Sequence, residues 1–390
     1  MATDNPAEMN TTMDPSKDIL PPNIVMADSF SPFKPSPQRG LMKYVRAGFG
    51  IIKLALIRRA LNDDLVYERY IRENLARLFV ANTTICNARC VFCPQQFHVD
   101  KKQAMPFDIF ADAIENFVAH GGRLVTLNSN NGDPLADPGL IDKIRHARKV
   151  GLPVLNFSTN GILLSRGTLV QDIAALVDEI DISLPGFDRE DYKRVYGVDR
   201  AEAVLDGLIK LIEAKRAANS PLRILLALRI DRPLEEVMAD EGMRQLKPYL
   251  DDGTVVIDPD QIYSEMETWS DQITAESLPG IMTLRTDVPV RTRPCKRMMN
   301  DVFLLADGQV RICACRIKLS NYDELVIGDT RTQPLADIVH GPAHRALLQR
   351  VAAGDWPEVC QDCTLYQAQD LPRQTWLAMA WDLLGGLFRR

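Results

Sequence analysis

Short apolar runs alternate with amphipathic stretches between residues 78 and 260, and this alternation constrains the fold more than any other feature of the chain. The runs lie at 78–85, 123–129, 153–159, 179–185, 223–230 and 254–260. Stretches such as PFDIFADAIENFVAH and AEAVLDGLIKLIEAKRA separate them and have the apolar spacing of helices. Strands that alternate with helices predict βαβ units and a parallel sheet. Six units are too few for a closed eight-stranded barrel, so we expect an α/β fold, either a partial (β/α)6 TIM-like barrel or an open sheet, with the chemistry at the carboxyl ends of the strands.

The segments on either side of this region differ from it in composition and periodicity. Residues 1–40 are polar and rich in proline, which predicts a disordered tail. Residues 41–60 have helical periodicity, and this basic amphipathic helix could pack on the barrel or lie on a membrane surface. Its expected apolar face comprises Leu41, Tyr44, Val45, Phe49 and Ile52. A hairpin is predicted around Asp307 and Gly308 in VFLLADGQVRIC. The expected division is a tail (1–40), N-terminal amphipathic helices (41–77), a barrel (78–285), a small α+β cysteine-rich module (286–367) and a C-terminal amphipathic helix (368–390).

Composition narrows the class of function. The net charge of −6 argues against a general nucleic-acid binder, because neutralising phosphates requires clustered Lys and Arg. No apolar stretch of about 18 residues could span a bilayer, and the first residues show no signal-peptide pattern. We therefore expect a cytoplasmic chain with reduced thiols.

The eight cysteines fall into two sets. The first set is Cys86, Cys90 and Cys93, and the second is Cys295, Cys313, Cys315, Cys360 and Cys363. About 200 residues between the sets contain no cysteine. Cysteines of a core would not segregate in this way, so the pattern predicts ligands for two metal sites.

The first set has the spacing C-x3-C-x2-C in a loop that follows the first predicted strand. Thiolates are the usual ligands of [4Fe–4S] clusters, and four are usual. Three thiolates in so short a loop would leave one iron open to a substrate or cofactor. A structural zinc site would need four closed ligands and fits this loop poorly.

With Phe92 in the aromatic position, this loop resembles the hallmark C-x3-C-x-aromatic-C of the radical S-adenosylmethionine (SAM) superfamily. The resemblance continues at successive strand ends: Asn131-Gly132-Asp133-Pro134 is similar to the family's Gly-Gly-Glu-Pro, Ser158-Thr159-Asn160-Gly161 to its S-T-N-G turn, and Ser183-Leu184-Pro185-Gly186 to S-L-D-G. Arg229 ends the fifth predicted strand, where a basic residue often pairs with the SAM carboxylate. The resemblance therefore implies SAM contacts at Phe92, Asn131, Gly132, Asp133, Pro134, Ser158, Asn160, Ser183 and Arg229. It also implies that SAM chelates the open iron and is cleaved to a 5′-deoxyadenosyl radical, which abstracts hydrogen from a substrate.

The second set predicts an auxiliary cluster. Cys295 and Cys313 flank the predicted hairpin, and Cys360 and Cys363 form a C-x2-C pair. This pattern resembles the twitch module, a shorter relative of the SPASM domain, and implies one further [4Fe–4S] cluster on these four thiolates. Cys315 could replace Cys313 or remain a free thiol, and spacing favours Cys313. Zinc on the same four cysteines is the main alternative.

An auxiliary cluster beside a radical site can accept the second electron of an oxidation. We therefore predict a radical SAM oxidoreductase of dehydrogenase type, which oxidises or rearranges a small polar metabolite such as a sugar or an aminocyclitol. The expected electron donor is a flavodoxin or ferredoxin. The alternatives are a peptide maturase and, less favoured, a cluster-bearing redox or scaffold protein that does not cleave SAM. Asp258, Asp260 and Tyr263 are further candidates for contact with the substrate by their position after the last predicted strand.

Overall fold

The computed structural model describes residues 42–64, 66–67, 77–97, 102–127, 132–269, 271–313, 324–369, 377 and 381. The predicted tail (1–40), Asn131, Cys315 and most of the predicted C-terminal helix lie outside the described residues. No helix in the described part of the chain is long and apolar enough to cross a bilayer.

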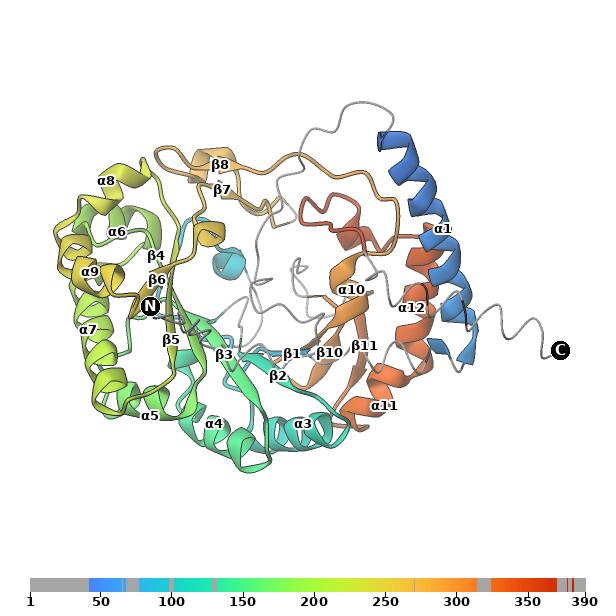
Figure 1. Cartoon of the computed structure of the whole chain (residues 1–390), viewed down its shortest axis with the longest axis horizontal. Coiled ribbons are helices and arrows are strands. Elements are labelled where there is room, and N and C mark those ends of the chain that lie inside the picture. Colours follow the sequence, from blue (N-terminus) through green and yellow to red (C-terminus); the bar gives the residue numbers. More distant parts are fainter. Residues whose placement is uncertain are drawn as a thin grey trace, which may run out of the picture.

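The six predicted strands form the parallel part of one curved sheet (Figure 1). They are β1 (Arg77–Val80), β2 (Leu124–Leu127), β3 (Val154–Thr159), β4 (Glu179–Leu184), β5 (Arg223–Leu228) and β6 (Val255–Ile257). Each pairs in parallel with the next, in chain order. The prediction of an α/β fold with a partial barrel of parallel strands is confirmed.

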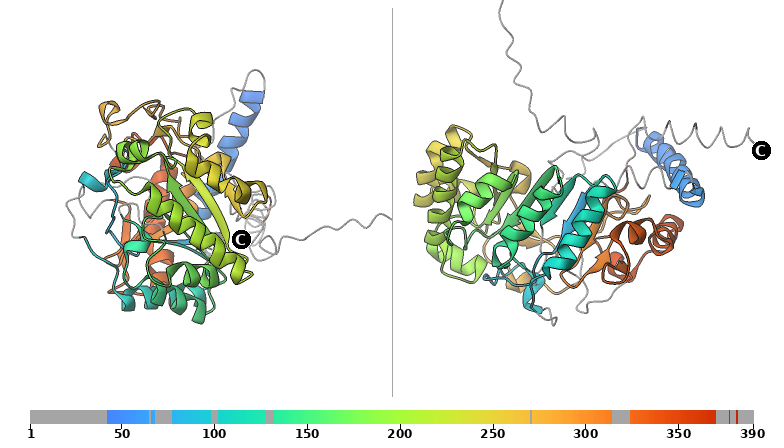
Figure 2. Two further views of the ribbon diagram at one scale, coloured as in Figure 1. Left: turned by 90° about the vertical axis from the view of Figure 1, so that its left-hand side faces the viewer. Right: turned by 90° about the horizontal axis from the view of Figure 1, so that it is seen from below.

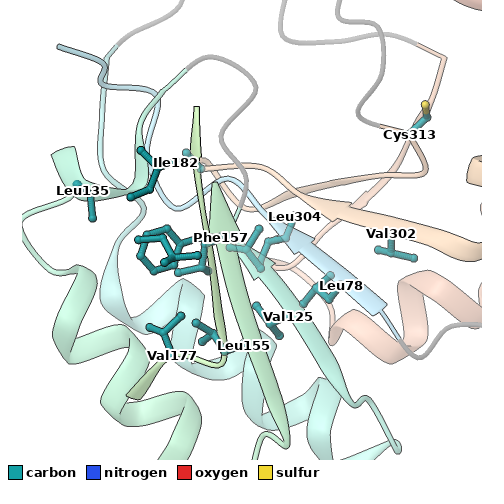
Figure 3. Packing of buried hydrophobic residues seen from close by; sticks show 14 of the residues in the cluster. Leu78, Val125, Leu135, Leu155, Phe157, Val177, Ile182, Val302, Leu304 and Cys313 are labelled. Atoms are coloured by element: carbon teal, nitrogen blue, oxygen red, sulfur yellow. The ribbon is translucent and has the colours of Figure 1, made fainter. Parts of the chain in front are cut away.

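Helices cover the outside of this sheet (Figures 1 and 2). They are α3 (Phe107–Ala119), α4 (Leu140–Lys149), α5 (Leu169–Leu176), α6 (Arg189–Tyr196), α7 (Ala201–Ala217), α8 (Leu234–Met238) and α9 (Glu241–Asp251). Their apolar faces pack on alternate strand residues. Leu155, Val125, Leu78 and Val302 are register partners from neighbouring strands and form one row of this core (Figure 3).

The predicted hairpin continues the same sheet on the other side of β1. The strand β9 (Asp301–Leu304) pairs in parallel with β1, and β10 (Gln309–Arg311) and β11 (Val326–Asp329) follow in antiparallel order. The helices α10 (Lys296–Asn300), α11 (Leu335–His340) and α12 (Pro342–Ala353) belong to this region. The sheet therefore runs without a break from β6 to β11, whereas the boundary at 285/286 stays a prediction.

The predicted N-terminal helix is α1 (Met42–Asn62), and it packs against α12. Ile57, Ala60 and Leu61 are buried, whereas Ile52 is 54% exposed. The expectation that Ile52 shares the packed face is wrong. The Nε of Arg58 donates to the carbonyl oxygen of Ala352 at 2.6 Å, so the C-terminal half of α1 fixes which face meets α12.

Two short strands complete the described structure. The strands β7 (Glu265–Met266) and β8 (Thr283–Leu284) pair with each other in a separate sheet beyond β6. The short 3-10 turns are η2 (Pro94–Phe97), η3 (Pro134–Ala136), η4 (Pro259–Gln261), η5 (Ala275–Ser277) and η6 (Glu358–Cys360).

Candidate functional site

The loop that carries the first cysteine set leaves β1 at the carboxyl end of the strands and is docked on the C-terminus of α6. The N–H of Arg89 donates to the carbonyl oxygen of Tyr196 at 2.9 Å, and that of Val91 donates to Val195 at 3.0 Å. Gly197 ends α6 with φ +67°, and a Cβ there would lie 2.6 Å from the Arg89 carbonyl oxygen. A glycine at this C-cap therefore allows the helix end and the cysteine loop to approach closely.

The three thiols of this loop are partly buried and lie close enough for their charges to repel one another. Burial raises the pKa of all three, to about 12 for Cys93, and mutual repulsion adds to the effect for Cys90. The Sγ of Cys86 accepts hydrogen bonds from the Ala88 N–H at 3.5 Å and from Asn160 Nδ2 at 3.7 Å. Thiolates in such a place need bound cations to offset their charge, which is what the irons of a cluster supply.

A cluster and a single ion place different demands on their ligands. A [4Fe–4S] cluster gives each thiolate its own iron, so its ligands do not share one ion. The assignment of Cys86, Cys90 and Cys93 as ligands of a cluster stays a prediction.

Asp133 of the loop after β2 connects two of the predicted motifs. Its carboxylate accepts hydrogen bonds from the Leu135 N–H at 3.0 Å, the Thr159 hydroxyl at 2.9 Å and the Asn160 N–H at 2.7 Å. Burial raises its pKa to about 6, and these hydrogen bonds oppose the rise. Asp133 thus fixes the loops after β2 and β3 beside Cys86. Gly132 lies next to it, and Pro134 begins η3.

A cavity of about 300 Å³ opens above these loops. Its lining comprises Cys86, Cys90, Phe92, Cys93, Pro94, Gly132, Asp133, Ser158, Thr159, Asn160, Asp181, Ser183, Tyr196, Ala227, Arg229, Gln261, Tyr263, Glu265, Met266, Glu267, Trp269, Arg285 and Leu365. The structure therefore places all but one of the predicted SAM contacts that it describes on one cavity, and Pro134 is the exception. Whether each of them binds SAM stays a prediction.

The side chains from later strand ends are held in place by their neighbours. The Ser183 hydroxyl is 2.9 Å from the Tyr196 hydroxyl, and the Tyr196 ring meets Phe92 edge-on with centroids 5.7 Å apart. The Nη1 of Arg229 donates to the carbonyl oxygen of Gln261 at 2.9 Å, and the guanidinium lies 4.3 Å from the centroid of the Tyr263 ring. Arg229 is thereby oriented at the cavity, and no acidic side chain among the described residues is within hydrogen-bonding range of it.

Two of the three further substrate candidates do not line the cavity. The Asp258 carboxylate caps η4 by accepting from the Asp260 N–H at 2.9 Å, and Asp260 is exposed. Tyr263 does line the cavity, and burial raises its pKa to about 12.

One wall of the cavity was not anticipated from the sequence. It comes from β7 and β8 and the segment between them, and it includes Glu265, Glu267, Trp269 and Arg285. The Nε of Arg285 donates to Glu265 Oε2 at 3.0 Å. Strands of two residues give no periodicity, so the sequence pattern contained no signal for this wall.

Four cysteines of the second set gather on the far side of that wall. Cys295 and Cys313 are buried, and no described cysteine forms a disulfide. Burial and repulsion from Cys313 and Cys295 raise the pKa of Cys360 and of Cys363, the latter to about 12. As with the first set, buried thiols that repel one another fit a cationic cluster.

The Cys360 and Cys363 loop is fixed by an arginine and two aromatic rings. Arg291 Nη2 donates to the carbonyl oxygens of Cys360 and Gln361, and its guanidinium lies 5.3 Å from the Trp356 ring centroid. The Trp356 ring meets Tyr366 edge-on at 5.7 Å. Trp356 therefore orders the cysteine loop through Arg291.

Part of the chain is similar in sequence to known proteins. A probable GTP 3′,8-cyclase of Sulfurisphaera tokodaii is 28% identical over 152 residues, which are 39% of this chain and 46% of that protein. A GTP 3′,8-cyclase of Lactiplantibacillus plantarum is 30% identical over 156 residues, which are 37% and 44%. The chain thus spans less than half the length of these curated relatives.

Two solved structures show weak likeness. BtrN in complex with AdoMet and 2-DOIA is 14% identical, with a TM-score of 0.46 over 74% of this chain and 92% of that chain. Streptococcus suis SuiB bound to S-adenosylmethionine is 12% identical, with a TM-score of 0.49 over 70% and 67%.

Family models match both cysteine regions. Residues 82–237 match the radical SAM superfamily, and residues 295–364 match the SPASM iron–sulfur cluster-binding domain. The first match implies a [4Fe–4S] cluster and SAM, and the second implies auxiliary iron–sulfur chemistry. The chain is therefore a member of the radical SAM superfamily, with a SPASM-like iron–sulfur module after its barrel.

Proposed function

We propose that this radical SAM enzyme is an oxidoreductase of dehydrogenase type, which removes two electrons from a small polar metabolite of the sugar or aminocyclitol class. One observation carries the proposal: a single cavity is lined by the first cysteine set and by a residue that is hydrogen-bonded next to the second set. Cys86, Cys90 and Cys93 line one side. On the other side, Glu267 lines the cavity and accepts a hydrogen bond from the Thr364 hydroxyl, next to Cys363.

This arrangement suits a reaction with two one-electron steps. In the first step, SAM on the cluster of Cys86, Cys90 and Cys93 supplies the radical that abstracts hydrogen from a substrate. The protein side chains orient the reactants: Asp133 and Asn160 hold the loops beside Cys86. Arg229 has no acidic partner in hydrogen-bonding range in the described part of the chain and can pair with a carboxylate. The second electron needs an acceptor within short reach of the same cavity, and the Cys295, Cys313, Cys360 and Cys363 set lies behind its far wall. A related rearrangement of the substrate is compatible with the same geometry.

The charge of the lining favours hydroxyl or amino groups over phosphates. The described lining holds four carboxyl groups (Asp133, Asp181, Glu265 and Glu267) and two guanidinium groups (Arg229 and Arg285). Arg285 is already paired with Glu265. Recognition of a triphosphate needs converging Arg, Lys or helix N-termini, and two arginines against four acids do not meet that need. The lining therefore argues against the nucleotide named for the curated relatives.

The size of the cavity favours a small molecule over a peptide. SAM and the cluster would occupy part of this cavity of about 300 Å³, and the space that remains suits a compact substrate better than an extended chain. The reductant is proposed to be a flavodoxin or ferredoxin.

The test is a substrate panel under anaerobic conditions. Reconstituted full-length protein receives SAM and dithionite with one carbon-deuterated probe at a time: 2-deoxystreptamine, glucosamine, myo-inositol, GTP or a short peptide. We expect deuterium in 5′-deoxyadenosine and loss of two hydrogens from an amino or hydroxyl probe. Turnover of GTP or the peptide alone would refute the proposal.

A further inference from the structure

Two acidic side chains lie on the inner face of β4, and one of them, Asp181, lines the cavity. Side chains alternate between the two faces of a strand, and Ile180 and Ile182 belong to the helix-covered core, so Glu179, Asp181 and Ser183 point into the barrel. Strand register places Asp181 beside Ser158 of β3 and Leu225 of β5. Ser183 thus lies at the level of the cluster loop, and Asp181 and Glu179 lie successively deeper.

Asp181 lines the cavity, and its two carboxyl oxygens differ in their hydrogen bonds. Its Oδ2 accepts from the Ser158 hydroxyl at 3.2 Å. Its Oδ1 is buried and has no hydrogen-bond partner among the residues that the structure describes. Burial and the charge of Asp258 raise the pKa of Asp181 to about 6, while the Ser158 hydroxyl and the charges of Arg229 and Arg223 oppose the rise. A proton on this carboxyl relieves the cost of its burial.

Glu179 connects this position to the opposite rim of the barrel. It is buried, and its Oε2 is 2.7 Å from Arg223 Nη1, whose side chain is half exposed. Burial, Asp181 and Asp258 raise the pKa of Glu179 to about 7, opposed by Arg223 and the Asn156 side chain. Two residues along a strand span roughly 7 Å, and both side chains lie on the same face of β4, so Glu179 is the next acidic side chain below Asp181 on that face.

The other acids of the lining are less suited to receive a proton. Asp133 accepts three hydrogen bonds that favour its ionised form and fix the loops. Glu265 is paired with Arg285, and the Glu267 carboxylate is engaged by Thr364.

We propose that Asp181 is the catalytic base of the oxidation and that Glu179 passes its proton to the lower rim of the barrel. This inference rests on the proposed function. Hydrogen-atom abstraction breaks a substrate C–H bond, and the hydrogen goes to the 5′-deoxyadenosyl group of cleaved SAM. The remaining carbon radical would give one electron to a cluster held by the module cysteines, and Asp181 would accept its O–H or N–H proton. A C=O or C=N bond forms, so that two electrons and two hydrogens have left the substrate.

The test compares the panel reaction in wild-type protein, Asp181→Asn and Glu179→Gln. Asp181→Asn removes the base but keeps the size of the side chain. We expect its oxidised product to fall by about 100-fold or more, while deuterium still enters 5′-deoxyadenosine. The acid limb of the wild-type pH profile, near pH 6, should disappear in this variant. Glu179→Gln should slow product formation by about tenfold or less. Asp206→Asn, an exposed position on α7, is the matched control.

A second measurement needs neither SAM nor substrate. Infrared difference spectra of the full chain between about pH 5 and about pH 8 should contain a protonated carboxyl band that Asp181→Asn lacks and Asp206→Asn retains. An unchanged product rate in Asp181→Asn, or the absence of such a band, overturns the inference while the proposed function stands. If wild-type protein oxidises no probe, the proposed function fails and the inference falls with it.

Discussion

A methyl group at Gly132 would press on the backbone that leads into the first cysteine set. A Cβ built there lies 2.5 Å from the Thr83 carbonyl oxygen and 3.0 Å from that of Ile85. Ordinary contact begins at 3.4 Å, so the shortfall is 3.4 − 2.5, or about 0.9 Å. Neither atom belongs to a flexible side chain, so the loop itself has to move.

The cost of Gly132→Ala can be worked from these contacts. Overpacking a buried site costs about 1–3 kcal/mol. Separation of the two loops also threatens the hydrogen bond from the Asp133 N–H to the Ile85 carbonyl oxygen, now 2.8 Å, which contributes about 1 kcal/mol. We expect the free energy of unfolding to fall by about 2–4 kcal/mol. Because Ile85 precedes Cys86, iron should be lost from the first site and retained at the second.

The assay is urea unfolding of the iron-free chain, together with iron analysis after reconstitution. Gly50→Ala in α1 is the matched control, because a Cβ there meets nothing within 4 Å and alanine favours a helix. Iron should fall from about eight to about four per chain in Gly132→Ala and stay at about eight in the control. Unchanged unfolding and full iron in Gly132→Ala would refute the reasoning.

Three further predictions follow from other contacts. Arg291→Met should lower the iron content toward about four per chain by emptying the second site, because the Cys360 carbonyl oxygen loses its hydrogen-bond donor. Unchanged EPR signals of the auxiliary cluster would count against this prediction. Asp133→Asn should lower stability by about 1–3 kcal/mol, measured by urea unfolding, since three donors lose an ionised acceptor. Because the pKa of Asp181 is raised, the folded state binds its proton more tightly than the unfolded chain does. The free energy of unfolding of the wild type should therefore drop relative to that of Asp181→Asn as the pH rises from about 4 to about 6, by an amount on the order of 1–3 kcal/mol. Parallel curves from pH-dependent unfolding would contradict this prediction.

The sequence predicted those elements of the fold that are specified by residues close together in the chain. The six strands, the hairpin at Asp307 and Gly308 and the helix from residue 42 are confirmed, because period and turn residues act within a few positions. The pairing of β9 with β1 joins segments more than 200 residues apart, and no periodicity specifies such a pairing. Ile52 was expected on the packed apolar face of α1 but is exposed, because both faces of that helix carry apolar residues.

The sequence likewise predicted only part of the candidate site. Sequence spacing identified the thiols, since cluster loops are short. It missed the wall from β7 and β8, and it missed the docking of the cysteine loop on α6, which depends on Gly197 and on backbone contacts. Asp181 had a signal: in the run EIDISLP, acids alternate with isoleucines, so one face of a buried strand had to carry charge into the barrel.

The central claim is that the first cysteine set holds the cluster at which SAM is cleaved. Its most direct measurement is the formation of 5′-deoxyadenosine from SAM by reconstituted, dithionite-reduced protein, in parallel with Cys90→Ala. We expect 5′-deoxyadenosine from the wild-type chain, none above background from Cys90→Ala, and about four irons retained in that variant at the second site. Equal 5′-deoxyadenosine from both proteins, or none from the wild-type chain, would contradict it.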